Sequence, residues 1–395
     1  MKTKTSLLAA LVLMGVGIAS GLRAHAGEHE SGNADSLRLS ESLLRPDSLR
    51  LSDSTYRITL LFAGDLMQHA GQITAGKKAD GTYDYSECFK YMTAEIERAD
   101  VAIANFETTL AGPPYTGYPQ FCSPDRFLLD CRDAGFDVML TANNHVCDRY
   151  SKGINRTIAV MDSLKVPHLG SYANAQERQK HYPFLLEKNG FRIVLLNYTY
   201  GTNGIPTREP CVVNYIDKKQ MAADIAKAKT MNPDAIIACM HWGVEYTLKP
   251  VAEQRALADW LFKQGVTHII GGHPHVVEPM EVRTDASGQK HVLVYSLGNF
   301  ISNMSKANTT GGMTVRLQLA KHHGKTTLAG TDYSLYFVSR PDMSKRGQYV
   351  VLPVSTPDAQ LSAKERAVRN QFVSAARAMF ARSNKGVTER PIPLK

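Results

Sequence analysis

Short apolar runs alternate along most of the chain with segments whose apolar residues recur at helical spacing. The segments between the runs predict helices over residues 86–98, 124–134, 150–164, 217–230 and 252–264. Pro124 suits the first turn of a helix, and Gly135 and Gly265 suit helix ends. This alternation predicts an α/β domain in which most strands are buried on both faces. The runs that read as strands are Ile58–Ala63, Val101–Ala104, Val138–Thr141, Ile193–Asn197, Ala235–Met240, His268–Ile270 and Val292–Ser296.

The C-terminal part of the chain predicts further strands followed by one helix. Residues 313–352 contain further strand-like stretches, and Thr314–Leu319 alternates between apolar and polar residues as a strand does. Residues 359–382 form a helical pattern rich in alanine and arginine. We therefore expect a principal domain over residues 56–322 and a C-terminal extension of strands and a helix over residues 323–395.

Residues 1–26 have the parts of a secretory signal peptide. Lys2 and Lys4 give a positive start, Leu7–Ile18 is a short apolar run, and Ala24-His25-Ala26 is a small-x-small cleavage pattern. The sequence therefore predicts export to the periplasm or the cell surface. The alternative is an uncleaved anchor, because the apolar stretch nearly reaches the length of a membrane span. Association with the membrane is expected only in that case.

Residues 27–55 differ from the rest because they are polar and repetitive. The hexamer Asp-Ser-Leu-Arg-Leu-Ser occurs at 35–40 and again at 47–52. Such a segment cannot bury much apolar surface, so we expect a flexible polar linker. A weakly amphipathic helix is the alternative.

Charge and cysteine content exclude some classes of protein. The 395-residue chain has a formal net charge of +9 at pH 7. Its lysines and arginines are scattered, with no basic stripe interleaved with aromatic residues, so nucleic acid is not an expected partner. The positive excess favours an anionic partner at the cell surface. The six cysteines include no CxxC pair, and Cys239 falls inside an apolar run, as a small buried residue does.

Polar residues follow most of the predicted strands directly. In open α/β sheets, ligands bind beyond the carboxyl ends of the strands, so side chains from several strand ends converge on one crevice. A lone histidine is most often structural, but five histidines at matching strand ends indicate a site. The residues in this position are Asp65, His69, Asn105, Glu107, Asn143, Asn144, His145, His241, Trp242, Glu245, His273, His275 and Asn299.

The ligand types indicate which ions such a site would hold. Imidazole, carboxylate and amide groups together suit Zn, Mn or Fe better than Ca or Mg. Two divalent ions bridged by a carboxylate would generate hydroxide and stabilise a developing oxyanion. Glycines beside the candidate ligands would let the backbone approach the ions or adopt unusual φ values. These glycines are Gly64, Gly243, Gly272 and Gly298.

The series of motifs resembles the CapA family, named for a protein of poly-γ-glutamate capsule synthesis. That family is similar to calcineurin-like metallophosphoesterases, which implies a four-layer αββα sandwich and two metal ions. The resemblance covers roughly residues 57–302, and the motifs are specific only as a set. The matching pieces are Gly64-Asp65, Asn105-Phe106-Glu107, Ala142-Asn143-Asn144-His145 with Asp148, His241-Trp242-Gly243 with Glu245, Gly272-His273-Pro274-His275 and Ser296-Leu297-Gly298-Asn299-Phe300.

The resemblance implies a role for each ligand. His145 would be the acid that stabilises the leaving group without binding metal. The chain departs from the parent pattern in two places: the Asp-x-His opening motif is absent, which leaves the role of His69 open, and the bridging Asp is Glu107. The implied ligands are Asp65 and His275 at one ion, Asn144, His241 and His273 at the other, and Glu107 between the two.

Several neighbouring residues have open roles. Glu245 can be a ligand, a catalytic base or a residue that orients His241. Trp242 can line a substrate pocket or pack in the core. The residues expected to touch substrate or to support the ligands are His69, Asn105, Asn143, Asp148, Trp242 and Asn299.

Two functions of different classes fit this sequence. The first is a metal-dependent hydrolase of capsule biosynthesis, acting on an anionic cell-envelope polymer of the poly-γ-glutamate type or on a phosphoester. Capsule-assembly proteins are its expected partners. The second is a non-catalytic subunit that binds or exports the polymer. The complete ligand series favours the enzyme, because a binding module has no evident need for His145 beside the ligands.

Overall fold

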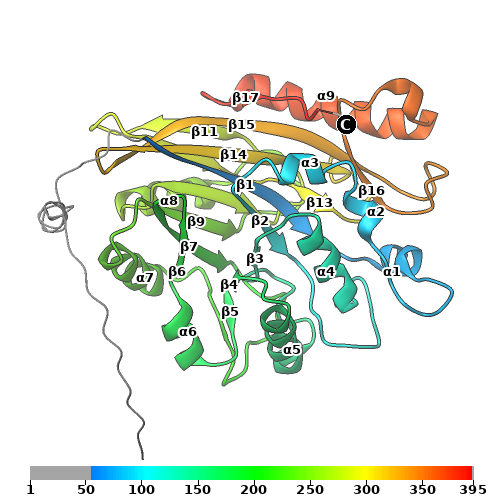
Figure 1. Ribbon diagram of the computed structural model, residues 1–395, viewed down its shortest axis with the longest axis horizontal. Coiled ribbons are helices and arrows are strands. Elements are labelled where there is room, and N and C mark those ends of the chain that lie inside the picture. The colour runs from blue at the N-terminus through cyan, green and yellow to red at the C-terminus, as the bar shows by residue number, and fades with distance from the viewer. Residues whose placement is uncertain (1–54, 394–395) are drawn as a thin grey trace, which may run out of the picture. The chain divides into compact units, whose positions relative to one another are not determined.

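Burial along the first strand shows how the layers form. In β1 (Tyr56–Leu66), Leu60 and Phe62 belong to one buried cluster, whereas Leu61 and Ala63 belong to another. Successive side chains of a strand point to opposite faces, so this strand is covered on both sides. The computed structural model describes residues 55–393, in which two sheets pack face to face with helices outside them (Figure 1).

The first sheet contains nine of the described strands, in the order β16-β15-β14-β1-β2-β3-β4, with β13 beside β1 and β17 beside β15. Strands β1 to β4 are parallel, and β14, β15 and β16 continue the sheet as antiparallel strands. The further bounds are β2 (Val101–Phe106), β3 (Val138–Leu140), β4 (His168–Leu169), β13 (Asn299–Ile301), β14 (Gly311–His322), β15 (Lys325–Ser339), β16 (Val350–Pro353) and β17 (Thr388–Glu389).

The second sheet contains six of the described strands, in the order β11-β12-β10-β9-β7-β6. Its four central strands are parallel, and β11 and β6 are antiparallel edges. The bounds are β6 (Phe184–Lys188), β7 (Phe191–Thr199), β9 (Ala235–His241), β10 (His268–Gly272), β11 (Met280–Thr284) and β12 (Lys290–Val294). A separate small sheet pairs β5 (Ser171–Tyr172) with β8 (Val212–Val213).

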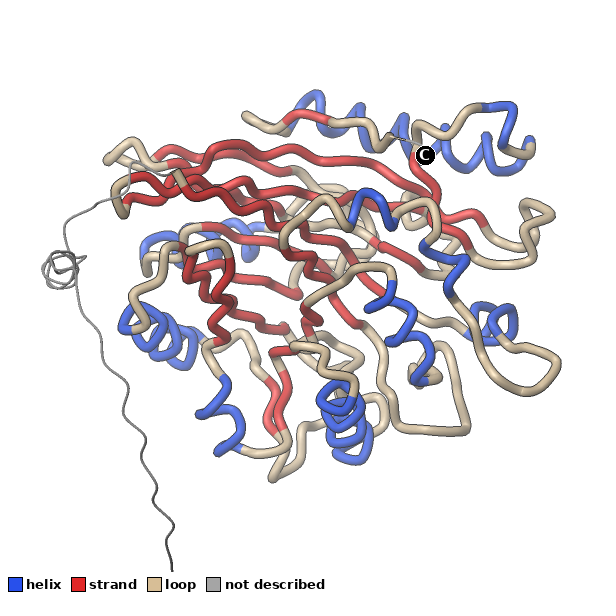
Figure 2. Tube along the Cα trace, viewed as in Figure 1, coloured by secondary structure: helices blue, strands red, loops and turns tan. Residues whose placement is uncertain are grey.

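Helices cover the outer faces of both sheets (Figure 2). Those covering the first sheet are α2 (Ser86–Phe89), α3 (Thr93–Ile96), α4 (Asp125–Asp133) and α5 (Tyr150–Ser163). Those packed on the second are α7 (Lys218–Thr230) and α8 (Ala252–Lys263). Between the sheets, side chains such as Leu60, Phe62 and Ile237 are fully buried, and each contributes about 1.5–3 kcal/mol relative to an exposed position. The predicted α/β fold with two sheets is confirmed.

The C-terminal segment packs on the same core. Helix α9 (Ala363–Ser383) begins at a capping box in which Ser362 and Glu365 bind each other's backbone N–H groups. Its Phe380 ring lies 5.0 Å from that of Tyr333 on β15. The chain after α9 then pairs with β11 through Lys385. The boundary predicted at 322/323 falls in the turn between β14 and β15, which pair along their lengths.

The predicted helices mostly match, and the exceptions have physical reasons. Residues 86–98 form two short helices, α2 and α3, separated by a turn at residues 90–92, and Phe89, Met92 and Ile96 all lie in one buried cluster. Gly135 and Gly265 follow α4 and α8 with φ values of 106° and 96°. The helices of the described residues that were not predicted are short: α1 (Ala70–Gly76), α6 (Ala175–His181) and the 3-10 helix η1 (Asp358–Gln360).

Strand register brings the predicted site residues into line. In the first sheet, Asp65 lies opposite Asn105 of β2 and Asn299 of β13. In the second sheet, His241 lies opposite Thr199 of β7 and Gly272 of β10. The carboxyl ends of the parallel strands of both sheets therefore supply the site.

Some predictions concern residues that the structure does not describe. The signal peptide of residues 1–26 lies outside the described part, as does nearly all of the linker of residues 27–55. Within residues 55–393, no helix has both the length and the apolar character that crossing a bilayer demands.

Candidate metal centre

Two fully buried carboxylates form the base of the site. The Asn105 amide Nδ2 donates to Asp65 Oδ1 at 2.8 Å and to Glu107 Oε2 at 2.9 Å. Asn143 fixes this amide by donating from Nδ2 to Asn105 Oδ1 at 3.1 Å and to the Phe106 carbonyl at 2.9 Å. Burial, together with the charge of Asp65, raises the pKa of Glu107 well above its ordinary value. The ionised form of this buried pair is therefore unfavourable unless a positive charge compensates it.

The second carboxylate oxygen of Glu107 faces imidazoles. Glu107 Oε1 lies 3.8 Å from His241 Nε2 and 3.9 Å from His275 Nε2, and it has no hydrogen-bond partner among the described residues. These separations are too long for hydrogen bonds. A buried carboxylate oxygen without a partner is costly, so the arrangement fits a cation shared by these groups.

The imidazoles of the site are buried, and the partners of His275 fix its tautomer. His275 Nδ1 lies 3.0 Å from Asn299 Oδ1 and 3.2 Å from Asp65 Oδ2. Both partners are acceptors, so Nδ1 carries the proton and Nε2 keeps its lone pair. Burial lowers the pKa of His241 and, with the charge of His275, lowers that of His273 to about 3. Neutral imidazoles are what a metal ion requires.

Asn144 joins the group from the end of β3. Its Oδ1 lies 2.8 Å from His241 Nε2. Its Nδ2 donates to Asn203 Oδ1 at 3.2 Å, which turns the carbonyl oxygen of the amide toward His241. The His241 ring in turn lies 4.8 Å from that of His273. These three predicted ligands of one ion are therefore neighbours.

Among residues 55–393, carboxylate and imidazole ligand atoms gather in two triads. One triad is Asp65, Glu107 and His241, and the other is Glu245, His273 and His275, with the ligand atoms of each within 4.8 Å of one another. The contacts of Glu107 and Asp65 with His275 connect the two. Glu245 accordingly lies with His273 and His275, and no hydrogen bond joins it to His241 in the described residues.

The backbone around the site is unusual in both sheets. His273 and His275 have φ values of 100° and 58°, which non-glycine residues adopt rarely and at a cost of about 1–3 kcal/mol each. Such conformations persist only where the surroundings impose them. In the first sheet, a Cβ on Gly64 would lie 1.8 Å from the Gly298 carbonyl oxygen, so only glycine allows β1 and the strand beside it to approach this closely.

His145 lies next to the candidate ligands and is held by a buried carboxylate. Its Nδ1 lies 2.7 Å from Asp148 Oδ2, which also accepts from the Phe121 N–H at 2.6 Å. The Phe121 ring makes an edge contact with the imidazole at 4.6 Å. A carboxylate on Nδ1 fixes the tautomer and leaves Nε2 available. His145 is also close enough to His241 and His273 for its charge to lower the pKa of both.

Two predicted residues lie at the margin. His69 Nδ1 contacts Gln72 Oε1 at 3.2 Å and the Asn303 N–H at 3.3 Å, and burial lowers its pKa to about 4. His69 belongs to neither triad. Trp242 is 2% exposed and donates from Nε1 to the Tyr295 carbonyl at 2.9 Å, so the structure favours the core-packing interpretation for this residue.

Sequence reasoning missed the loop that follows β7. Tyr200 is 47% exposed, and its ring lies 4.4 Å from the His273 ring. Asn203 holds Asn144, as described above. The signal was present, because this loop follows the apolar run Ile193–Asn197 just as the other site loops follow theirs. Residues 198–208 contain no histidine, aspartate or glutamate, and those residue types marked most of the other site loops.

The chain is similar to proteins of bacterial capsule synthesis. The family model described as bacterial capsule synthesis protein PGA_cap matches residues 59–304, more than half of the chain. Capsule biosynthesis protein CapA of Bacillus anthracis is 26% identical over 276 residues, covering 67% of this chain and 64% of that protein. PGA biosynthesis protein CapA of Bacillus subtilis is 27% identical over 274 residues, covering 66% of this chain and 67% of that protein. The chain thus spans slightly less than two thirds of the first relative.

A phosphatase and a phosphoesterase are among the solved structures to which the chain is weakly similar. A phosphatase from Mycoplasma pneumoniae shares 16% identity with a TM-score of 0.42, covering 73% of this chain and 96% of that chain. Calcineurin-like phosphoesterase YfkN from Bacillus subtilis shares 14% identity with a TM-score of 0.43, covering 82% of this chain and 98% of that chain. At these identities the likeness concerns the fold alone, and the chemistry of the site rests on the contacts described above.

Proposed function

The chain belongs to the family of bacterial capsule synthesis proteins PGA_cap, and from that premise we propose that it is an exported, metal-dependent hydrolase acting on an anionic cell-envelope polymer. The relatives named for capsule biosynthesis support a capsule-related role. The hydrolytic activity, the export and the polymer are the parts that we add.

One observation carries the proposal of a metal enzyme: the unpartnered Oε1 of fully buried Glu107, which faces His241 and His275. Within the described part of the chain, neither Asp65 nor Glu107 has a lysine or arginine partner. Two buried carboxylates need a compensating positive charge. The mixture of carboxylate, amide and imidazole donors suits Zn, Mn or Fe.

The residues divide the work between holding the ions and moving a proton. A divalent metal bound here would polarise the scissile bond and supply hydroxide near neutral pH. Asp65 and His275 would hold one ion and Glu107 would bridge. Asn144, His241 and His273 would hold the other ion, with Glu245 beside His273 as a further carboxylate. Protonated His145 would give its Nε2 proton to the leaving group, because Asp148 accepts from its Nδ1.

The proposed substrate is a polymer that carries carboxylates, of the poly-γ-glutamate type. The Bacillus subtilis relative is named for PGA biosynthesis, and the formal charge of +6 that is left of +9 after removal of Lys2, Lys4 and Arg23 favours an anionic partner. Export follows from Lys2, Lys4, the apolar run and Ala24-His25-Ala26. N-terminal sequencing of protein isolated from cells tests this step, with Gly27 as the expected first residue and an intact Met1 as the contrary result.

The decisive experiment compares His145→Ala with His273→Ala and Asn144→Ala. His145→Ala should keep its metal but lose activity by about 10²–10⁴-fold, since it removes a proton donor and no ligand. The other two variants should lose metal as well. Metal content is measured by elemental analysis after supply of Mn, Zn or Fe, and function by restoration of capsule in a deletion strain.

Two outcomes would contradict the proposal. Near-zero metal in the wild-type protein under every supply would exclude the metal centre. Full restoration of capsule by His145→Ala at a normal protein level, with metal bound, would exclude catalysis. The non-catalytic subunit that binds or exports the polymer would then take its place.

A further inference from the structure

The loop of residues 302–309, which joins β13 to β14, is attached to the site at both ends. At one end, the Asn303 N–H lies 3.3 Å from His69 Nδ1. At the other, Asn299 Nδ2 donates to the Thr309 carbonyl at 3.0 Å, while Asn299 Oδ1 contacts His275 Nδ1 at 3.0 Å. The two ends of this loop are therefore held by His69, at the margin of the site, and by Asn299, the partner of His275.

Lys306 lies at the exposed bend of this loop. Its carbonyl accepts from the Thr309 N–H at 3.1 Å and from the Thr309 hydroxyl at 2.7 Å, which holds the backbone in place. Its ammonium lies 3.6 Å from the centre of the Tyr246 ring. Across residues 55–393, no carboxylate forms an ion pair with Lys306, so all its N–H donors face solvent or the ring. An ammonium held on the face of an aromatic ring keeps its charge, and its side chain has fewer accessible conformations.

Tyr246 places this cation beside the site. Its backbone N–H donates to the Pro274 carbonyl at 2.8 Å, between the two candidate ligands His273 and His275. Tyr246 has a φ of 69°, which is unfavourable for tyrosine, and it makes this hydrogen bond in that conformation. The Tyr246 ring lies 6.2 Å from the His275 ring. Together, the two ring contacts place the ammonium close to the His275 ring. The distance between them is at most the length of about three residues of an extended polymer chain.

We propose that Lys306, held over Tyr246, binds a carboxylate of the polymer next to the bond that lies at the metal centre. The inference rests on the proposed function for the position of that bond. The ammonium offers charge-assisted hydrogen bonds to an anionic oxygen. Lys306 and Tyr246 would therefore determine which bond of the polymer lies at the metal centre. They would not take part in the reaction itself.

The test measures binding of a fluorescent oligomer of γ-linked glutamate to the full-length protein by anisotropy, in the presence of a chelator. Lys306→Ala should weaken binding about tenfold, the size expected when one charge-assisted hydrogen bond is lost. Lys306→Arg should restore most of it. Tyr246→Leu should weaken binding by a smaller factor, because Lys306 then lacks its support. The methyl ester of the oligomer should bind weakly and equally to the wild type and Lys306→Ala.

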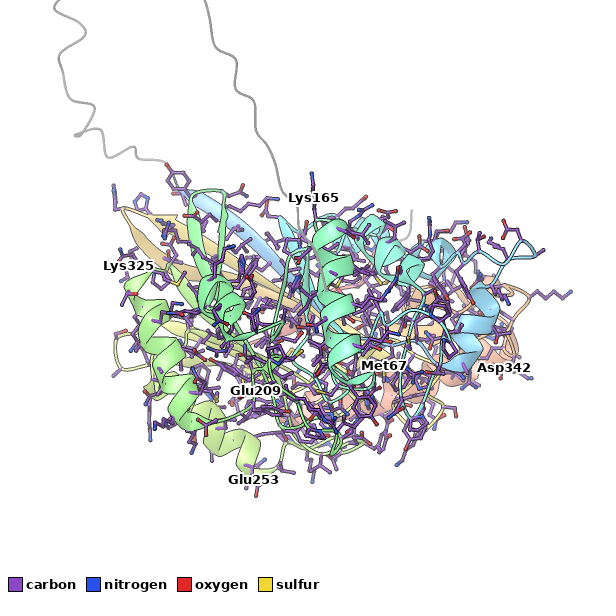
Figure 3. The ribbon with its side chains drawn as sticks, turned by 90° about the horizontal axis from the view of Figure 1, so that it is seen from below. Met67, Lys165, Glu209, Glu253, Lys325 and Asp342 are labelled. Atoms are coloured by element: carbon purple, nitrogen blue, oxygen red, sulfur yellow. The ribbon has the colours of Figure 1, made fainter. Side chains whose placement is uncertain are left out.

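Lys325→Ala is the matched control. Lys325 is an exposed lysine that starts β15 at the far end of β14 from Lys306, without an ion pair to described residues. Figure 3 shows it well separated from Met67, which follows β1 at the site. This variant removes the same charge from the protein and should bind the oligomer like the wild type.

Each contrary result has its own meaning. Equal binding by Lys306→Ala and the wild type, equal loss in Lys325→Ala, or no binding by the wild type would overturn the inference. Polyphosphate that binds more tightly, with the same dependence on Lys306, would overturn the assignment to a carboxylate. Failure of the metal and His145 experiments would instead remove the proposed function and leave these binding measurements standing.

Discussion

The two sheets contribute opposite kinds of chemistry to the site. The first sheet supplies oxygen ligands, Asp65 and Glu107, whose positions are fixed by the amide of Asn105. The second supplies the imidazoles, with Glu245 as its one carboxylate in the two triads of the described residues, and His273 and His275 lie on backbone of positive φ. One side is therefore organised by hydrogen bonds that exist without a metal. The other side is held in a costly conformation by its surroundings.

The difference shows how such a centre can be assembled from two separate layers. Oxygen ligands repel one another, so they need donors such as Asn105 to stay together before an ion arrives. Neutral imidazoles do not repel one another, so the backbone can bring them together, and hydrogen bonds such as those of His275 then orient the rings. Substitutions on the two sides should consequently fail in different ways.

The largest effect is expected for Glu107→Gln. Removing the carboxylate that faces both His241 and His275 should lower metal affinity by more than about 100-fold, because losses of this size already follow changes in residues that only support ligands. Glu278→Gln is the matched control. Glu278 is also fully buried and accepts from an amide, Gln254 Nε2, at 2.9 Å. Competition with a metal-sensitive dye measures both variants, and equal losses would contradict the role of Glu107.

A smaller difference is expected between alanine substitutions at a glycine of the first sheet and at a glycine of the second, measured as the change in the free energy of unfolding. Gly64→Ala places a Cβ 1.8 Å from the Gly298 carbonyl oxygen and should destabilise the protein by about 3 kcal/mol. Gly272→Ala places its Cβ 3.3 Å from Asp65 Oδ1 and should change stability by less than about 1 kcal/mol while disturbing metal binding. Urea denaturation with and without chelator distinguishes them. Equal destabilisation would mean that the first sheet is no more rigid than the second.

The smallest effect concerns Asn203, which touches a ligand without being one. Asn203→Ala should lower metal affinity about tenfold, because Asn144 loses the acceptor that orients its amide. Asn232→Ala is a control with the same backbone conformation, since φ is 52° at Asn203 and 50° at Asn232. The same dye competition applies. Unchanged metal affinity in Asn203→Ala would show that Asn144 is oriented by its own strand.

The strands and their ends could be predicted because buried parallel strands leave continuous apolar runs. Ala235–Met240 was expected and β9 spans Ala235–His241, which ends on a candidate ligand. The same logic located Asp65, Glu107 and His273. The packing of one sheet on another could not be obtained from period or spacing. It entered only through the family resemblance, as did the division of ligands between two ions.

Contacts between distant loops were beyond sequence reasoning. Glu245 lies next to His273 and His275 because the loop after β9 turns toward that after β10, where Tyr246 binds Pro274. Nothing in the spacing of Glu245 reveals this turn. Lys306 over Tyr246 is a similar case, since it depends on two loops whose paths are set by their attachment to the site.

Asn197 has a consequence for how much change the molecule can tolerate. Its Oδ1 accepts from the Ala142 N–H at 2.8 Å in the first sheet, and its Nδ2 donates to the Cys239 carbonyl at 3.1 Å in the second. It is buried just ahead of the loops that carry Asn144 and His241. The separation of the two layers is thus fixed locally by one amide. Apolar side chains farther along the interface can exchange size during evolution without altering the spacing between ligands.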